Sequence, residues 1–176
     1  DNGVANLSPN QPTAYDLVVT HEVPAGGASG LGAIRVIVDD SIPAALDKDT
    51  LECPAAVDPE DPCWSYCPGI PTDPATDYTI GNCPVALVEG SGDIDGEIIE
   101  LAEGSSTTIV INARVDAGFT SGSISNTATV TLDSAETFTI TDITPGDNTS
   151  TDTDPVGTGT DLQVVKDDGV TLAIPG

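Results

Sequence analysis

The chain has 176 residues, with 4 Lys and Arg against 29 Asp and Glu, which gives a formal net charge of −25 at pH 7. A surface this acidic repels nucleic acid and anionic membranes, so neither is an expected partner. Hydrophobic residues make up 38% of the chain. That share is enough for the core of one domain, but no apolar run is long enough to cross a bilayer.

Short stretches in which apolar and polar residues alternate, separated by Gly and Pro, predict β-strands. In chain order they cover 15–22, 33–40, 85–88, 97–101, 106–115, 123–132 and, as an edge strand, 136–141. No amphipathic helical period of useful length lies between them. We therefore predict an all-β fold, an immunoglobulin-like Greek-key β-sandwich formed by residues 1–143.

Four cysteines lie within 47–84, a stretch rich in Pro and Asp: Cys53, Cys63, Cys67 and Cys83. An even number of cysteines in such a chain indicates an oxidising compartment and two disulfides. Of the three pairings that the sequence allows, we expect Cys53 with Cys83 and Cys63 with Cys67, stapling a long loop. The alternative is a four-thiolate zinc site, for which the usual paired Cys-x-x-Cys spacing is absent.

The end of the chain repeats its beginning. Residues 167–176 match residues 1–10 at four positions without a gap. A strand-like run, Asp161-Leu-Gln-Val-Val-Lys166, precedes the second copy, and nothing like it precedes the first. We therefore expect a polar linker over 144–160 and then, in 161–176, a spare strand. This donor strand would complete the sheet of a neighbouring molecule through Leu162, Val164 and Val165.

Several motifs resemble those of the repeat called domain of unknown function 11. They are Val36-Ile-Val-Asp-Asp-Ser-Ile-Pro-Ala-Ala-Leu46, Ser125-Asn-Thr-Ala-Thr-Val130, Thr144-Pro-Gly-Asp-Asn-Thr149 and the run 161–166. The resemblance implies an immunoglobulin-like sandwich of the kind found in tandem on microbial surface proteins, with structural or adhesive work and no catalytic turnover. The chain departs from the family in its long cysteine loop and in lacking the family's opening strand.

Three predicted strands each carry one polar residue on an otherwise apolar face. These residues are Asp40, Asn126 and Lys166. Burial raises the pKa of a carboxyl group and lowers that of an amine, which leaves a neutral amine as a nucleophile. Two outcomes stay open: an ordinary ion pair between Lys166 and Asp40, or a spontaneous isopeptide bond from Lys166 to Asn126 in which Asp40 moves the proton.

The remaining motifs are short. Asn6-Leu-Ser8 and Asn148-Thr-Ser150 are glycosylation sequons. Asp152 and Asp154 have calcium-like spacing without a complete ligand loop, so they are either calcium ligands or solvated turn residues, and calcium is the only cofactor expected. The single histidine, His21, argues against a Ser-His-Asp triad.

These features together predict an extracellular or cell-surface structural protein and not an enzyme. Its partner would be itself, polymerised head to tail by strand donation into a pilus-like fibre. One alternative is a repeat of a long tandem adhesin, and another is a monomeric extracellular module that binds its ligand through the cysteine loop. Trp64 and Tyr66, which lie between cysteines, are either ligand contacts or, as we expect, pack over the disulfides.

Overall fold

The computed structural model describes residues 6–27, 30, 32–48, 61–68, 86–135 and 141–158. These residues contain strands and no helix, and they form two antiparallel sheets. The strands are β1 (Pro12–Thr20), β2 (Ala33–Asp40), β3 (Leu46–Lys48), β4 (Cys63–Tyr66), β5 (Val88–Ser91), β6 (Ile94–Ala102), β7 (Ser106–Val115), β8 (Ser121–Leu132) and β9 (Thr149–Gly157). A search of the described residues for a helix able to span a membrane found none.

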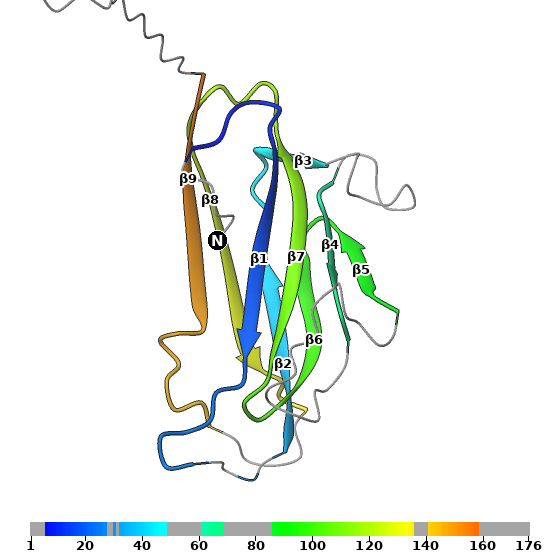
Figure 1. Ribbon diagram of the computed structural model, residues 1–176, viewed down its shortest axis with the longest axis vertical. Helices are drawn as coiled ribbons and strands as arrows, with labels where there is room; N and C mark the ends of the chain where they lie inside the picture. Colours follow the sequence, from blue (N-terminus) through cyan, green and yellow to red (C-terminus); the bar gives the residue numbers. More distant parts are fainter. Residues whose placement is uncertain are drawn as a thin grey trace, which may run out of the picture.

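The two sheets lie face to face (Figure 1). One sheet has the order β1-β7-β4-β5, with β3 beside β7, and the other has the order β6-β2-β8-β9. The edge strands β1 and β9 lie on the same side of the molecule, because a hydrogen bond joins Tyr15 of β1 to Asp154 of β9. Near the end of β9, Leu7 forms a parallel bridge to Val156 and so ties the segment before β1 to this side.

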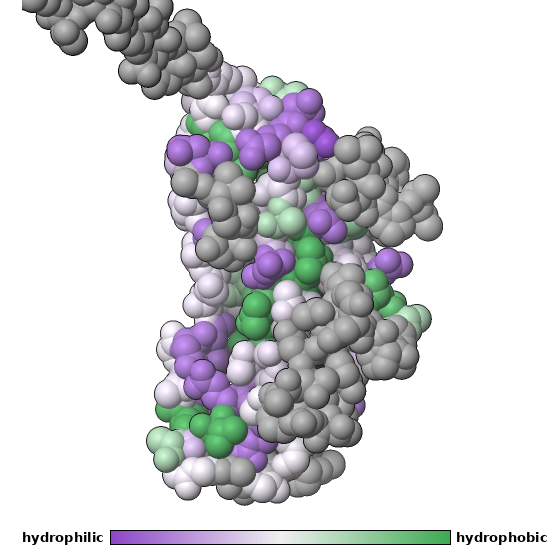
Figure 2. All heavy atoms as spheres, viewed as in Figure 1, coloured by the Kyte–Doolittle hydropathy of each residue, from purple (hydrophilic) through white to green (hydrophobic). Residues whose placement is uncertain are grey.

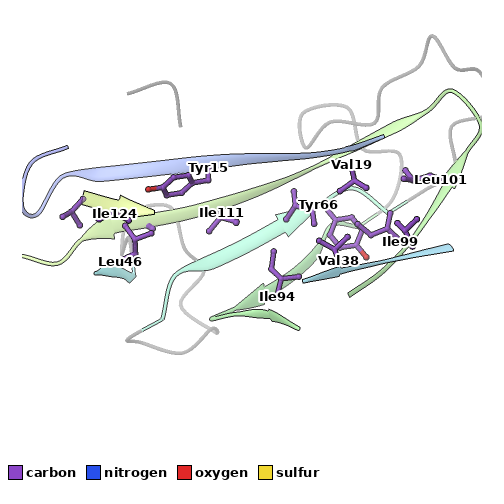
Figure 3. Packing of buried hydrophobic residues seen from close by; sticks show 14 of the residues in the cluster. Tyr15, Val19, Val38, Leu46, Tyr66, Ile94, Ile99, Leu101, Ile111 and Ile124 are labelled. Atoms are coloured by element: carbon purple, nitrogen blue, oxygen red, sulfur yellow. The ribbon is translucent and has the colours of Figure 1, made fainter. Parts of the chain in front are cut away.

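The core comes from the alternation of side chains along the strands. On β2 and β7 every second residue is buried, so one apolar face of each strand meets the other sheet. Ile109 and Ile111 of β7 are fully buried, and Figure 3 shows Ile111 among the core residues contributed by other strands. Each large aliphatic side chain buried in this way contributes about 1.5–3 kcal/mol.

The strands with the clearest alternation are confirmed. β2 and β7 begin and end at the residues that the sequence predicts, and β8 is two residues longer at its start. β1 begins and ends slightly earlier than predicted, while β5 and β6 lie close to the predicted stretches. Most of the predicted edge strand 136–141 lies outside the described residues.

The prediction that 47–84 is a stapled loop is wrong for Cys63–Tyr66, because β4 lies inside a sheet, while 49–60 and 69–84 lie outside the described residues. β4 pairs with β7 on one side and with β5 on the other. Trp64 and Tyr66 stand opposite Ile111 and Ile109 of β7, and Tyr66 belongs to the core. Alternation therefore turns both aromatic side chains away from the face that carries Cys63, and the prediction that they pack over disulfides stays a prediction.

The prediction of a polar linker over 144–160 is also wrong, because β9 pairs with β8 along its whole length and extends the sandwich beyond residue 143. On its outer face, hydroxyl groups form cross-strand hydrogen bonds, Thr127 with Thr151 at 2.8 Å and Ser125 with Thr153 at 2.7 Å. Such Thr and Ser pairs stabilise antiparallel strands. The segment is polar because it is an edge strand with one wet face, and not because it is unfolded.

Candidate functional site

A groove of about 600 Å³ opens between the edge strand β1 and the second half of β8. It exists because β9 pairs with β8 only as far as Thr129, so the last residues of β8 have no β9 beside them. The inward-facing residues of its floor are apolar: Ile34, Val36, Val38, Ala128, Val130 and Leu132. The groove is therefore an opening in the side of the sandwich that leads onto the core.

The mouth of the groove lies where β1 ends. Val23 and Ile143 line it and are 49% and 72% exposed. Figure 2 shows apolar residues in small separate groups among polar ones, and one of these groups lies at this end of the molecule, beyond the end of β1. A chain that covered the groove at this end would bury these two side chains as well.

Beside this groove, β1 has an edge that pairs with no other strand of the described residues, and we call it the free edge. Among the described residues, β1 pairs only with β7. Val115 donates its N–H to the carbonyl of Gln11, and His21 donates its N–H to the carbonyl of Ser105, both at 2.9 Å. In an antiparallel pair these bonds recur at every second residue, so the odd-numbered residues of β1 bond towards β7. The even-numbered residues, Val18 among them, direct their N–H and C=O groups to the free edge.

Beyond one end of the groove's apolar floor, the next inward-facing residues of β2 and β8 form a buried polar pair, which does not itself line the groove. Asp40 is the next inward-facing residue of β2 after Val38, and Asn126 precedes Ala128 on the inward face of β8. The Nδ2 atom of Asn126 donates to Oδ2 of Asp40 at 2.9 Å. The two residues are only 2% and 7% exposed. The structure thus brings together two of the three polar residues that the sequence places on apolar faces.

Each member of the pair keeps an unsatisfied oxygen. Oδ1 of Asp40 and Oδ1 of Asn126 are buried and have no hydrogen-bond partner in the described part of the chain. Burial raises the pKa of Asp40; the hydrogen bond from Asn126 opposes this shift, and the negative charge of Asp93 adds to it. Orphaned buried oxygens are costly in a folded protein, so this end of the groove suits an incoming hydrogen-bond donor.

Further polar residues of β9 and β1 flank the pair. Asp152 stands opposite Asn126 on the inward face of β9, and the buried Asp154 accepts a hydrogen bond of 3.5 Å from the hydroxyl of Tyr15. Sequence analysis missed the role of Tyr15. Its only signal was the period of two that places Tyr15 in line with Leu17 on the inward face of β1.

The calcium interpretation gains no support from this arrangement. Asp152 and Asp154 belong to a strand and not to a chelating loop. Within the described ranges, no group of three or more His, Cys, Asp or Glu is placed to hold a metal ion. Calcium at these residues remains a prediction from spacing alone.

The predicted cysteine pairing does not fit the strand that carries it. Cys63 and Cys67 are both buried, and neither is a free thiol. Cys63 lies opposite Asn112 of β7, whereas the carbonyl of Cys67 accepts a hydrogen bond of 3.5 Å from Thr107, near the other end of β7. Four residues of extended chain span about 13 Å. A disulfide needs Cα atoms about 4.4–6.8 Å apart, so a bond between Cys63 and Cys67 is excluded while β4 stays extended.

Other predicted residues lie apart from the groove's polar end. Asn6 is exposed, while Asn148 is half-buried and donates its Nδ2 to Asp142 at 2.5 Å. His21 is placed with its Nδ1 atom 3.3 Å from the carbonyl oxygen of Leu101, which suits a structural role. Outside the described residues lie Cys53, Cys83, Leu162, Val164, Val165 and Lys166.

Comparison with known proteins adds little. No family model and no curated protein matches the chain. Among solved structures, one similar chain is described as "AvmM Catalyzes Macrocyclization in Alchivemycin A Biosynthesis". It is 13% identical, and the match covers 92% of this chain and 88% of that one with a TM-score of 0.43. A similarity of this strength carries no argument about function.

Proposed function

We propose that this chain is a structural subunit of an extracellular filament, assembled head to tail when residues 161–166 of one subunit enter the groove of the next. The observation that carries the proposal is the groove itself, which lies beside the free edge of β1 and leads onto apolar core residues. A strand placed there would extend the sheet through backbone hydrogen bonds and fill the opening with alternate side chains.

The donor segment has the pattern that the groove requires. Leu162 and Val164 are two residues apart, as are Val36 and Val38 in the floor. Residues at this spacing share one face of a strand and lie about 6.6 Å apart. Gln163 and Val165 then face outward, in line with the exposed side chain of Val18 on β1.

The binding free energy expected for one donated strand suits reversible docking, and many such contacts along a fibre stabilise the polymer. Burying Leu162 and Val164 contributes about 1.5–3 kcal/mol for each side chain. Each new backbone hydrogen bond adds about 0.5–1.5 kcal/mol net. The contact is heterologous, since a strand meets a groove, so it continues from subunit to subunit as a fibre unless the rotation closes a ring.

The finer features of the proposal rest on the sequence. Four cysteines support an oxidising, extracellular setting with two disulfides, and the exposed Asn6 remains a candidate for a glycan. The family resemblance supports an immunoglobulin-like Greek-key order of the strands and a surface protein without catalytic turnover. The net charge of −25 supports a saline setting in which counterions screen repulsion between subunits.

A second candidate is one repeat of a tandem cell-surface adhesin. The observation that favours it is the echo of residues 1–10 in residues 167–176. In such a protein the same groove would receive a strand from a covalent neighbour instead of a separate molecule. The gene distinguishes the two proposals, because the reading frame of a tandem adhesin continues past residue 176 into the next repeat.

The test is negative-stain microscopy of the purified full chain and of a form lacking 161–176. Filaments should form only from the full chain. A point variant repeats the test without truncation: Leu162→Asp with Val164→Asp places two charges against the groove and should abolish filaments. The matched control, Gln163→Asp with Val165→Asp, adds the same charge on the outward face and should still polymerise. Filaments that persist without 161–176 would rule out strand donation.

A further inference from the structure

We propose that assembly ends in a covalent bond: Nζ of Lys166 in the donated strand attacks Cγ of Asn126 in the receiving subunit, and Asp40 carries the proton. This inference rests on the proposed strand donation and extends it to a second, chemical step. What motivates it is the buried Asp–Asn pair next to the apolar floor of the groove, with one oxygen on each residue that has no partner among the described residues.

The spacing of the donor strand matches that of the floor. Lys166 comes four residues after Leu162 in the donor strand, as Asp40 comes four residues after Val36 on β2. Both intervals span about 13 Å in an extended chain. If Leu162 lies over the apolar part of the groove, the side chain at position 166 therefore arrives at the polar end.

Placing Leu162 in the groove and Lys166 at the polar end also fixes the direction of the donor strand. On β1, the chain passes from Tyr15, which bonds to Asp154 at the polar end, to Val19 in the groove. A donor running from Leu162 in the groove to Lys166 at the polar end runs the opposite way. It therefore pairs with β1 as an antiparallel strand, the slightly more stable of the two arrangements.

Charge also favours a lysine at this place. The polar end holds the carboxyl groups of Asp40, Asp152 and Asp154 on inward-facing positions, and the unsatisfied oxygens of Asp40 and Asn126 need donors. An amine is a donor only, so it suits these oxygens. The chain contains two lysines, Lys48 and Lys166, and only Lys166 lies in the predicted donor strand.

The hydrogen bond between Asn126 and Asp40 indicates the path of the proton. Asp40 Oδ2 already contacts Nδ2 of Asn126, the nitrogen that leaves, and the buried Asp40 Oδ1 has no hydrogen-bond partner among the described residues, so it can accept from the incoming amine once the donated strand reaches it. The neutral amine forms the Nζ–Cγ bond as the Cγ–Nδ2 bond breaks. One proton passes from the amine to the leaving nitrogen through the carboxyl group of Asp40. The products are a secondary amide and one molecule of ammonia, so atoms and electrons balance without another reactant.

The protonation states that this step needs follow from burial. Desolvation raises the pKa of Asp40, which favours a proton-bearing carboxyl group able to protonate the leaving nitrogen. Desolvation likewise lowers the pKa of a lysine that is drawn between two sheets, which favours the nucleophilic amine. If instead both groups stay charged, the same residues form an ion pair and no ammonia leaves.

The experiment compares three full chains by microscopy, hot-detergent gel electrophoresis and mass spectrometry. The wild type should form filaments that survive detergent as a ladder, with loss of one ammonia for each joint and a cross-linked peptide containing Lys166 and Asn126. Lys166→Arg keeps the positive charge but removes the nucleophilic amine, so filaments should form and separate fully into monomers. The matched control, Lys48→Arg, should behave as the wild type.

A second pair of variants tests the receiving side. Asn126→Ala removes the acceptor and should abolish the ladder while filaments remain. Asp40→Asn keeps a hydrogen-bonding side chain without a transferable carboxyl proton, and it should slow the appearance of the ladder on a time course.

The failures of the two proposals look different. Wild-type filaments that separate into monomers without loss of ammonia would overturn the covalent bond and leave strand donation standing. Loss of ammonia in a species that still migrates as a monomer would place the bond within one chain and overturn the intersubunit assignment. A cross-linked peptide containing Lys48 would overturn the choice of lysine, and absence of filaments would overturn both proposals.

Discussion

The free edge of β1 permits a substitution that separates assembly from folding. The N–H of Val18 points away from β7, and its side chain is 57% exposed. Val18→Pro therefore removes a hydrogen-bond donor from the edge that a donated strand would use. The ladder between β1 and β7 keeps all its bonds, because proline is tolerated in an edge strand where its nitrogen faces solvent.

The magnitude follows from the bond that is lost. One backbone hydrogen bond contributes about 0.5–1.5 kcal/mol net, so its loss should raise the critical concentration for assembly about two- to twelvefold. The proline ring adds bulk on the same edge and moves the effect in the same direction. The free energy of unfolding of the unassembled subunit should change by about 0.5 kcal/mol or less, as for most exposed substitutions.

Two measurements check this prediction together. Light scattering against protein concentration gives the critical concentration, and urea unfolding of the unassembled subunit gives its stability. Val18→Thr keeps the N–H at the edge and is the matched control for loss of the valine side chain. Unchanged assembly by a Val18→Pro subunit of normal stability would show that the edge of β1 is not where subunits meet.

Three further results are expected. Gly90→Ala should destabilise the fold by about 1–3 kcal/mol in urea unfolding, because its Cβ would lie 2.2 Å from the indole of Trp64; unchanged stability would contradict the placement of β4 beside β5. Asp40→Asn should stabilise the unassembled subunit at pH 7. The pKa of Asp40 is raised in the folded state, so the free energy of unfolding falls as the pH rises from the unfolded-state pKa of about 3.9 through the folded-state pKa, and asparagine avoids this loss. That advantage should vanish below about pH 3.9, and an equal advantage at both pH values would refute the assignment. Peptide mapping of the oxidised protein should find Cys63 and Cys67 in separate bridges, and a peptide that joins them to each other would show that β4 is not extended.

Alternation of apolar residues predicted the strands that are buried on one face and wet on the other. β2, β7 and β8 follow this pattern, and their bounds could be read almost directly. β4 could not be recognised, because its four residues are too short for a period and lie among prolines and cysteines. Its place in the sheet depends on pairing with β5 and β7, which are distant in sequence.

β9 was missed for a different reason. Its inward positions include Asp152 and Asp154, so polar residues occupy both faces and hydrophobic alternation is lost. The same rule of alternation did place Asp40 and Asn126 on inward faces. What the sequence alone could not supply is the register of β2 and β8, which sets Asp40 opposite Ala128 and so brings Asn126 within reach.

The proposed strand donation gives the buried pair a physical use. The inward positions of β2 before Asp40 hold Ile or Val, which would pack there without loss. Instead the subunit keeps two orphaned oxygens, each of which costs about 1–3 kcal/mol. In the proposed assembly, a donor amine would remove that cost only when the strand docks, so the penalty in the free subunit would become a driving force for the polymer. It would also provide selectivity: a foreign apolar strand could fill the groove but would leave both oxygens unpaired, whereas a strand with lysine four residues after leucine would satisfy them.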